Sequence, residues 1–371
     1  EIPVVYAASD AAKGLGQLLQ RFGHLGAHSR LIRSALDGGT NDSPPPEPVL
    51  EQYGPLLPAP MGEYESMVIL SGNSASMVPR VAAVQSWLAL GQIVSLSPKP
   101  PQLLVLTFGV SAPVAAARAP PSTVCSAADS AILGLVPVLR LEQQGLRILN
   151  ADVSPGGAGA TVSIQELVGE TSPRGELQLA YVGRELFVSR MRCNPAALES
   201  TRVSARFIRG GAFLLTGGLG GLGLRSARML VAEHAARIVL ASRSGRFERA
   251  GEELASLWPD SASGPRSSVL ACDVSLALEG LCVAQRLLDS RRVGVLHTAG
   301  VLRDALVRNM AGSRMTSAFA PKALGASHLH ALLTTVGLSA FVLFSSISSA
   351  VGNAGQSNYG AANAYLDALA Q

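Results

Sequence analysis

Residues 211–234, GAFLLTGGLGGLGLRSARMLVAEH, place an apolar run, a glycine-rich turn and a helix-forming segment in immediate succession. The apolar run predicts a buried strand, and the final segment predicts a helix. Gly217, Gly220 and Gly223 allow a tight turn, a close approach of backbone amides to an anion, and close packing of helix on strand. The stretch therefore predicts a phosphate-binding turn, although a glycine-rich turn without function is the alternative interpretation.

The alternation of strand and helix continues from about Phe207 to the end of the chain. Further strands are predicted at 236–242, 267–274, 293–300 and 340–345, with helices at 246–258 and 281–290. Because right-handed crossovers place helices on both faces of such a sheet, we expect a doubly wound, Rossmann-like parallel sheet.

The first half follows a related but less regular pattern. Strands are predicted at 2–8, 101–110 and 146–153, helices at 73–90 and 128–143, a hairpin at 176–191 and an exposed proline-rich loop at 43–50. No glycine turn follows its early strands. We therefore expect an α/β fold of two Rossmann-like halves: residues 1–207 a degenerate structural subdomain without a cofactor site, and residues 208–371 a catalytic subdomain.

Composition excludes several function classes. The 371 residues are 48% hydrophobic and 15% charged, as expected of a globular chain with two cores. The net charge is +4, but the arginines form no basic run, which argues against nucleic-acid binding. No apolar run reaches the roughly 18 residues of a membrane span. Four cysteines without paired spacing predict a reduced, metal-free protein of the cytoplasm.

The ends of the predicted strands define a candidate dinucleotide site. The turn itself contributes Thr216, Gly217, Gly218, Leu219, Gly220, Gly221, Leu222 and Gly223. After the second strand, Ser242 and Arg243 stand where an NAD-selective site carries an acidic residue, so we predict NADPH, with Arg243 on the 2'-phosphate and Ser242 assisting. The alternative is that Arg243 is an ordinary surface arginine.

The next two strands complete this candidate site. Asp273 and Val274 follow the third strand, where they are expected to meet the adenine. The turn formed by His297, Thr298, Ala299 and Gly300 is expected to lie beneath the cofactor as its floor.

The segment 341–369, FVLFSSISSAVGNAGQSNYGAANAYLDAL, carries a second set of polar groups. Ser346 ends a strand-like run, Tyr359 begins an alanine-rich predicted helix, and Asn363 lies one turn further on the same face. These groups suit proton transfer to a carbonyl, although serines and a tyrosine are common in any strand, loop and helix. Lysine is rare, with only Lys13, Lys99 and Lys322 among thirty basic residues, so a compact ammonium at Lys322 is expected to be specific.

The glycine turn, the 297–300 turn and the Ser346–Tyr359 pair together resemble the short-chain dehydrogenase/reductase family. Ordinary members carry Tyr-x-x-x-Lys, but here Asn363 follows Tyr359 by four residues and the available lysine is Lys322. This exchange is similar to the ketoreductase domains of type I polyketide synthases and animal-type fatty acid synthases. The resemblance covers nearly the whole chain, because those domains also have a degenerate α/β half before the catalytic one.

The resemblance implies an NADPH-dependent β-ketoacyl reductase that acts on a thioester carried by an acyl carrier protein, among neighbouring synthase domains. It implies that Tyr359 protonates the developing alkoxide and that Ser346 binds the carbonyl oxygen. Lys322 would assist the tyrosine and hold the nicotinamide ribose, and Asn363 would orient Lys322 or a relay water.

Stereochemistry is a further implication. In Gly300-Val301-Leu302-Arg303-Asp304, Asp304 matches the last residue of the Leu-Asp-Asp motif of B-type domains, whereas Arg303 replaces the middle Asp. Val351 stands where A-type domains have tryptophan. We expect a B-type, D-configured product, with a helix cap as the alternative role of Asp304.

Two alternatives of other classes stay open at this point. The chain could be a catalytically silent reductase-like module that serves structure or docking in a megasynthase, or a stand-alone reductase of small carbonyls. The family continues through further strands and a substrate lid, whereas this chain stops at Gln371. We therefore expect the catalytic half to be incomplete at its C-terminus.

Overall fold

A computed structural model of the chain shows two compact α/β units. It describes residues 4–7, 31–33, 66–70, 78–111, 127–153, 176–182, 185–190, 208–246, 266–287, 290, 292–333 and 338–371. Unit 1 comprises Glu1–Arg190, Leu302–Phe319 and Ser346–Gln371, and unit 2 comprises Met191–Val301 and Ala320–Ser345. The segments that carry Ser346 and Tyr359 are thus grouped with the first half of the chain.

Unit 1 contains a seven-stranded sheet of order β2-β1-β3-β4-β5-β6-β7. Its strands are β1 (Val4–Ala7), β2 (Leu31–Arg33), β3 (Ser66–Leu70), β4 (Gln102–Phe108), β5 (Ile148–Val153), β6 (Gln178–Val182) and β7 (Glu185–Val188). All neighbours are parallel except β6 and β7, which form the predicted antiparallel hairpin. The sequence analysis did not predict β2 or β3.

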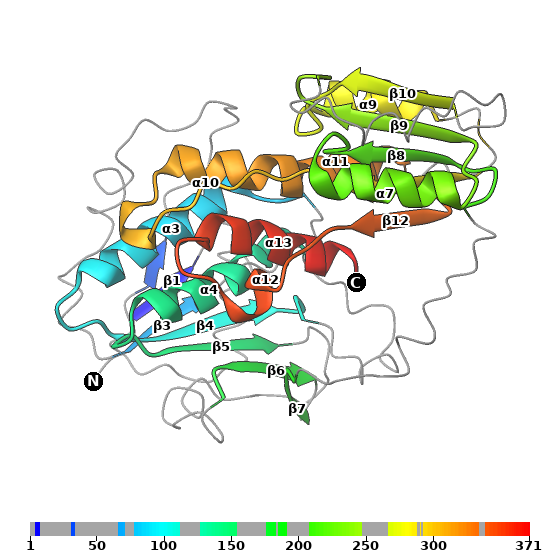
Figure 1. Cartoon of the computed structure of the whole chain (residues 1–371). Helices are drawn as coiled ribbons and strands as arrows, with labels where there is room; N and C mark the ends of the chain where they lie inside the picture. The colour runs from blue at the N-terminus through cyan, green and yellow to red at the C-terminus, as the bar shows by residue number, and fades with distance from the viewer. Residues whose placement is uncertain are drawn as a thin grey trace. The chain divides into compact units, whose positions relative to one another are not determined.

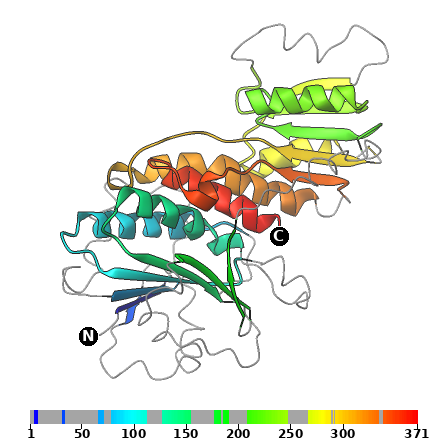
Figure 2. The same cartoon turned by 60° about the horizontal axis from the view of Figure 1, so that its bottom comes forward.

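A layer of helices covers one face of this sheet, as Figures 1 and 2 show. The helical elements of unit 1 are α3 (Val81–Leu96), η4 (Ala127–Asp129), α4 (Ala131–Glu142), η7 (Val307–Asn309), α10 (Gly312–Phe319), α12 (Ser348–Val351) and α13 (Ser357–Leu369). Helix α13 packs on α4, α10 and α12. Trp87, Leu88 and Leu135 are buried beneath this layer, so the hydrophobic effect holds it on the sheet.

Helices α4 and α13 meet backbone to backbone at a pair of glycines. A Cβ atom added to Gly134 would lie 2.0 Å from the carbonyl oxygen of Gly360, and one added to Gly360 would lie 2.6 Å from the carbonyl oxygen of Gly134. Since no side chain fits at either position, the two glycines fix where α13 crosses α4.

Unit 2 contains a five-stranded parallel sheet of order β10-β9-β8-β11-β12. Its strands are β8 (Ala212–Thr216), β9 (Arg237–Ser242), β10 (Arg266–Ala271), β11 (Val293–His297) and β12 (Ala340–Leu343). Its helical elements are α7 (Gly221–Ala232), α9 (Ala277–Gln285), the π-helix η8 (Ala320–Leu324) and α11 (Gly325–Leu333). This order reverses direction between β8 and β11, which is the switch point where open α/β sheets bind ligands.

Each face of this second sheet has its own hydrophobic core. Leu224, Ala227 and Leu230 of α7 pack with Leu240 and other residues on one face. Val283 of α9 and Leu329 of α11 pack with Val239 and Val295 on the other face. Figure 1 shows α7 on the near face of this sheet. The predicted doubly wound parallel sheet is therefore confirmed.

The boundaries of some predictions lie outside the described residues, including the helix at 246–258 and the loop at 43–50. Helix α3 begins at Val81, two residues after Pro79, which disfavours helical backbone at Val78 before it. No described helix is long and apolar enough to cross a membrane. Within the same ranges, no three His, Cys, Asp or Glu side chains gather closely enough to hold a metal ion.

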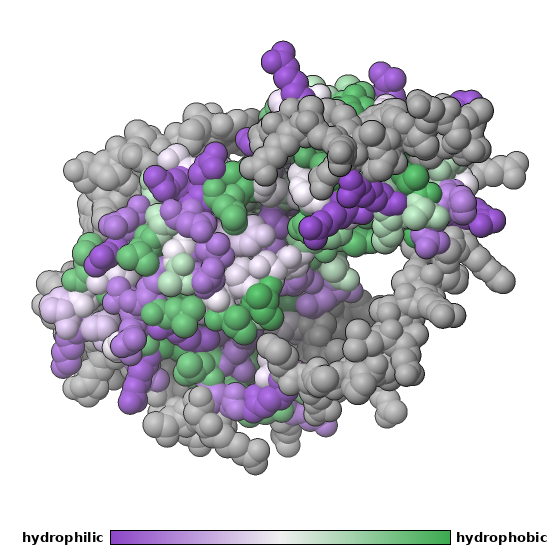
Figure 3. Space-filling model, viewed as in Figure 1, coloured by the Kyte–Doolittle hydropathy of each residue, from purple (hydrophilic) through white to green (hydrophobic). Residues whose placement is uncertain are grey.

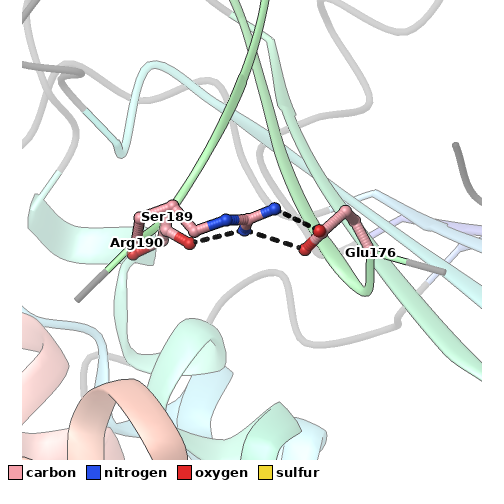
Figure 4. Close-up of polar contacts among 3 residues, drawn as sticks. All are labelled: Glu176, Ser189 and Arg190. Atoms are coloured by element: carbon pink, nitrogen blue, oxygen red, sulfur yellow. Dashed lines mark hydrogen bonds and ion pairs between the residues drawn. The ribbon is translucent and has the colours of Figure 1, made fainter. Parts of the chain in front are cut away.

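Arg190 and Glu176 flank the β6–β7 hairpin and join its two ends. The Arg190 guanidinium donates to both Glu176 carboxylate oxygens and also to the carbonyl of Ser189, as Figure 4 shows. The pair joins the two ends of the hairpin. Because it is solvent-exposed, it contributes little to stability.

Candidate active site

The turn after β8 has the close packing that its glycines predict. Gly217 has a φ of 65°, and a Cβ atom there would lie 2.7 Å from the Cα of Ala299. A Cβ on Gly218 would lie 2.6 Å from the carbonyl oxygen of Leu215. By contrast, a Cβ on Gly221 would meet nothing within 4 Å, so this side of the turn is open.

The open side coincides with the start of α7. Gly220 is the N-cap residue and gives no side-chain cap, so the first amides of α7 point outward without a side-chain acceptor. The Gly218 amide donates to the carbonyl of Ala241, and the Gly220 amide donates to that of Gly217, which fixes the turn. A tight turn before an uncapped helix N-terminus fits the pyrophosphate of a dinucleotide.

The residues after β9 and β10 lie at the same carboxyl edge of the parallel sheet. The Ser242 hydroxyl accepts a hydrogen bond of 3.1 Å from the Gly245 amide, and the Arg243 side chain is exposed. Asp273 uses one carboxylate oxygen locally, since Oδ1 accepts from the amide and the hydroxyl of Ser275 at 3.0 and 2.6 Å. Only the other carboxylate oxygen of Asp273 is therefore left for the predicted contact with adenine. The Val274 side chain is buried.

The turn after β11 is tied to the glycine turn. The Thr298 amide and hydroxyl both donate to the carbonyl of Thr216, at 3.0 and 2.7 Å. The Thr216 hydroxyl lies 2.7 Å from Nδ1 of His297, and neither residue is exposed. Burial lowers the pKa of His297 to about 4, so the ring is neutral at neutral pH.

Lys322 lies in the π-helix η8, an element that the sequence did not predict. Its side chain is 3% exposed, and Nζ donates to the carbonyl of Phe344 over 2.7 Å. Single π-turns inside α-helices occur frequently at functional sites. The lysine that the sequence singled out is therefore buried with its ammonium directed to the end of β12.

Ser346 lies where β12 leads into α12, in unit 1. Its hydroxyl oxygen lies 3.0 Å from the Ser348 hydroxyl and 3.3 Å from the Ser348 amide. The Ser349 hydroxyl lies 2.7 Å from the Ser346 carbonyl and 2.6 Å from Oδ2 of Asp367 in α13. These contacts hold the backbone of the serine against the helix that carries Tyr359.

Tyr359 and Asn363 occupy the first turns of α13. The Asn363 side-chain amide donates to the Tyr359 carbonyl at 2.8 Å, and Asn363 is fully buried while Tyr359 is half-buried. The Tyr359 amide donates to Oδ1 of Asn358, whose own amide nitrogen donates to the carbonyls of Arg303 and Arg314. This network fixes the start of α13 relative to the segment 303–314.

Asp304 lies beside the loop that precedes Tyr359. The side-chain amide of Gln356 donates through Nε2 to Oδ2 of Asp304 at 3.0 Å, and the backbone amide of Ala305 donates to the Gly355 carbonyl at 2.8 Å. The N-cap of the following η7 turn is Leu306, so Asp304 does not cap it.

Glu142, at the end of α4, was missed by the sequence analysis. One of its carboxylate oxygens accepts from the Gly355 amide at 2.9 Å, and the other accepts from the Val307 amide at 2.6 Å. Glu142 thus joins the loop before Tyr359 to the segment after Asp304. Asn358 and Asp367 were missed too, because a single polar residue in a helix gives no local signal of its distant partners.

The predicted residues fall into two groups. Ser346, Tyr359, Asn363 and Asp304 belong to unit 1, whereas Lys322 and the whole predicted dinucleotide set belong to unit 2. Within unit 1, hydrogen bonds connect the serine loop, the tyrosine helix and the Asp304 segment. A glycine turn at the switch point of a parallel sheet, with the predicted proton-transfer residues on the same chain, is typical of a Rossmann-type oxidoreductase.

Comparison with known proteins narrows this class. Residues 211–371 match the family model of the KR domain. The chain is 32% identical over 361 residues to polyketide synthase GfsB of Streptomyces halstedii, which covers 93% of this chain and 6% of that synthase. It is 44% identical over 166 residues to the spectinabilin polyketide synthase system protein NorB of Streptomyces orinoci, covering 43% of this chain and 7% of NorB.

Solved structures agree along the whole chain. "Structure of A-type Ketoreductases from Modular Polyketide Synthase" superposes with a TM-score of 0.75 at 26% identity, covering 99% of this chain and 75% of that one. "The first ketoreductase of the tylosin PKS" gives 0.73 at 27% identity, covering 100% and 76%. The chain belongs to the ketoreductase domains of modular polyketide synthases. Such domains are oxidoreductases that reduce β-keto groups.

Proposed function

We propose that this domain uses NADPH to reduce a β-ketoacyl thioester on an acyl carrier protein to the β-hydroxyacyl thioester, within the polyketide synthase. The observation that carries this proposal is the anchored set in unit 1, where the half-buried Tyr359 lies in the first turn of α13 and hydrogen bonds join the Ser346 loop to the same helix. This chain matches only 6% of the length of the synthase GfsB. We therefore propose that the carrier protein and the neighbouring synthase domains are its partners.

The cofactor assignment rests on unit 2. The glycine cradle and the open N-terminus of α7 suit a pyrophosphate, and the exposed Arg243 after β9 suits a 2'-phosphate. Thr216–Gly223 would hold the pyrophosphate, Ser242 and Arg243 the ribose phosphate, and Asp273 with Val274 the adenine. The bound nicotinamide would supply the hydride that reduces the keto carbon.

The chain's own residues would manage the carbonyl oxygen and its proton. Ser346 would donate a hydrogen bond to that oxygen, and Tyr359 would donate the proton as negative charge develops on it. The Lys322 ammonium would favour transfer of the tyrosine proton and would bind ribose hydroxyls. Asn363, held by the Tyr359 carbonyl, would orient Lys322 or a relay water.

The acyl part of the substrate would meet an apolar surface. Ile347 and Val351 of the α12 region are 63% and 52% exposed, directly after Ser346 in the chain. Figure 3 shows hydrophobic residues over α12 among hydrophilic neighbours. An exposed apolar pair beside the serine suits an acyl chain better than a small polar carbonyl compound.

We assign the domain to the B type, which forms the D-hydroxyl product. Asp304 supports this assignment because it accepts a hydrogen bond from the side chain of Gln356, which precedes Tyr359 by three residues. Val351, where A-type domains have tryptophan, is consistent with it. We further propose a cytoplasmic location for the synthase.

The decisive experiment compares the protein with Tyr359→Phe. We expect the substitution to lower kcat for NADPH oxidation with a β-ketoacyl thioester by roughly 100-fold to 10,000-fold, since it removes the proton donor. NADPH binding, followed by fluorescence, should be unchanged because only the hydroxyl is lost. Phe187, distant in the β6–β7 hairpin, offers a matched control as Phe187→Tyr, which should retain full activity.

Equal rates for wild type and Tyr359→Phe would overturn the mechanism. Binding of NADPH without any turnover in wild type would instead favour a silent structural module. Turnover of small free ketones at rates that exceed those of the thioester would favour a stand-alone carbonyl reductase.

A further inference from the structure

His297 makes hydrogen bonds through both of its ring nitrogens within unit 2. Nδ1 lies 2.7 Å from the Thr216 hydroxyl, and Nε2 lies 3.0 Å from the carbonyl oxygen of Lys322. The ring is fully buried. Both nitrogens are therefore engaged inside the protein, and the imidazole links the end of β8 to the backbone of the π-helix.

The partners determine the tautomer of the ring. A carbonyl oxygen only accepts, so Nε2 carries the proton and donates to Lys322. Nδ1 then accepts from the Thr216 hydroxyl, which can rotate to donate. Burial, which lowers the pKa of His297 to about 4, keeps this neutral form at neutral pH.

The chain around the π-helix makes room for this contact. A Cβ atom on Gly325, directly after η8, would lie 3.2 Å from Cε1 of His297 and 2.8 Å from Cγ2 of Val274. The glycine therefore lets the ring approach the helix. Lys322 lies in the wide turn of the π-helix, and its backbone carbonyl there accepts a hydrogen bond from the His297 side chain.

The far end of the same lysine is also constrained. Nζ donates to the Phe344 carbonyl at 2.7 Å, and a Cβ on Gly300 would lie 2.9 Å from Cε of Lys322. The side chain thus passes over Gly300 on its way to β12. The turn that contains residues 297 and 300 therefore contacts Lys322 twice. His297 binds the backbone carbonyl of Lys322, and Gly300 leaves room for its side chain.

We propose that His297 is a positioning residue for Lys322, and that through the Lys322 carbonyl it fixes where the ammonium is presented. This inference rests on the proposed role of Lys322 in the reduction. It also changes the role expected for the 297–300 turn, because the imidazole is committed to the lysine and not to the cofactor.

A direct test observes the lysine in the protein without cofactor or substrate. The chain has three lysines, so lysine labelled with 13C at Cε gives three signals, and the Lys322→Arg variant identifies the third. We expect His297→Leu to shift the Lys322 signal and to leave those of Lys13 and Lys99 in place. His328→Leu is the matched control, because His328 Nδ1 also contacts a backbone carbonyl, that of Val274, at 3.3 Å. It should move none of the three.

A second pair of variants keeps the proposal testable if His297→Leu does not fold. His297→Gln retains a donor for the Lys322 carbonyl, and we expect it to restore most of the wild-type shift. Thr216→Val removes the hydroxyl that sets the tautomer, and we expect an intermediate shift. Lys322 signals identical to wild type in folded His297→Leu, or in Thr216→Val if the former does not fold, would overturn the proposal.

Kinetics separate this inference from the proposed function. If Lys322 acts as proposed, Lys322→Arg loses activity, and His297→Leu lowers kcat/KM by about 10- to 100-fold and alters its pH profile, with partial rescue in His297→Gln. Full activity of Lys322→Arg would reject the proposed role of the lysine. A wild-type pH profile and rate in His297→Leu, with Lys322→Arg inactive, would reject only the positioning role.

Discussion

Each of the two sheets carries a hydrogen-bonded pair of a threonine and a titratable residue on neighbouring parallel strands, but the titratable residue makes different further contacts in the two sheets. In unit 1, Thr107 of β4 and Asp152 of β5 are register partners, and the Thr107 hydroxyl donates to the Asp152 carboxylate at 2.7 Å. In unit 2, Thr216 of β8 and His297 of β11 are register partners joined at the same distance, 2.7 Å. Both titratable partners are buried.

The two pairs differ in the further hydrogen-bond partners of the titratable side chain. Asp152 turns back on the loop after β4 and accepts from the amides of Val110 and Ser111 at 3.1 and 2.9 Å. Those amides are therefore occupied by the protein's own carboxyl group, at the edge where a parallel sheet would bind a phosphate. His297 turns away to the Lys322 carbonyl and leaves the amides at the start of α7 open. One exchange of residue type thus separates a self-closed loop from a ligand-ready one.

Removing the Asp152 carboxylate should have the largest effect. Asp152→Ala leaves a buried amide, a partly buried amide and a buried hydroxyl without their acceptor, so we expect the unfolding free energy to fall by about 4 kcal/mol in urea denaturation. NADPH affinity should be unchanged, because the turn residues proposed to bind the cofactor belong to unit 2. Thr107→Val, which removes one donor and keeps the carboxylate on both amides, should cost only about 1 kcal/mol. A carboxylate without structural importance would give equal stability in all three proteins.

The two pairs should also respond to pH in opposite directions. Burial lowers the pKa of His297 from 6.5 to about 4, and the charge of Lys322 acts in the same direction. The folded state therefore favours the neutral ring, and its stabilising effect, roughly 3 kcal/mol, is present above pH 6.5 and is lost as the pH falls toward 4. Burial raises the pKa of Asp152, with the hydrogen bonds opposing it, so its contribution is lost as the pH rises.

The measurement is the difference in unfolding free energy between wild type and His297→Gln from pH 7 to pH 4. We expect wild type to lose stability relative to the variant over that range. A constant difference would show that His297 titrates alike in the folded and unfolded chains, and would remove the contrast between the two pairs.

The turns themselves differ in how much they tolerate a side chain. Gly217 and Gly109 have φ angles of 65° and 62°. Gly217→Ala adds a clash with Ala299 to the backbone strain, so we expect about 2 kcal/mol of lost NADPH affinity, roughly a 30-fold rise in Kd. Gly109→Ala should reduce stability by about 1 kcal/mol and leave the NADPH Kd as it is. Equal effects on Kd would contradict the separation of roles.

The smallest effect concerns cofactor choice. Arg243→Ala removes an exposed guanidinium, and we expect the preference for NADPH over NADH to fall about tenfold, measured as the ratio of their Kd values. Arg246→Ala, three residues further along the exposed turn, is the control and should change neither constant. A parallel loss of both affinities in Arg243→Ala would show that Arg243 does not bind the 2'-phosphate.

Local patterns predicted the parts of the fold that depend on neighbouring residues. The glycine turn with its flanking strand and helix, the hairpin at 176–191 and the helix at Tyr359 all followed from periodicity and turn residues. The π-helix at Lys322 did not, and the contact of its carbonyl with His297, 25 residues earlier in the chain, is equally invisible to a local pattern. Glu142 was missed for the same reason, since its two amide partners lie more than 160 residues away.

The Gly134–Gly360 crossing has a consequence for recombination between related synthases. The backbone of the tyrosine helix rests on a helix encoded more than 200 residues earlier, and neither contact position accepts even a methyl group. A chimera that joins the first half of one such chain to the second half of another must therefore keep glycine at both positions. Exchanges that keep the glycine turn and Tyr359 but not this crossing would misplace the proposed proton donor while every proposed catalytic residue stays in the sequence.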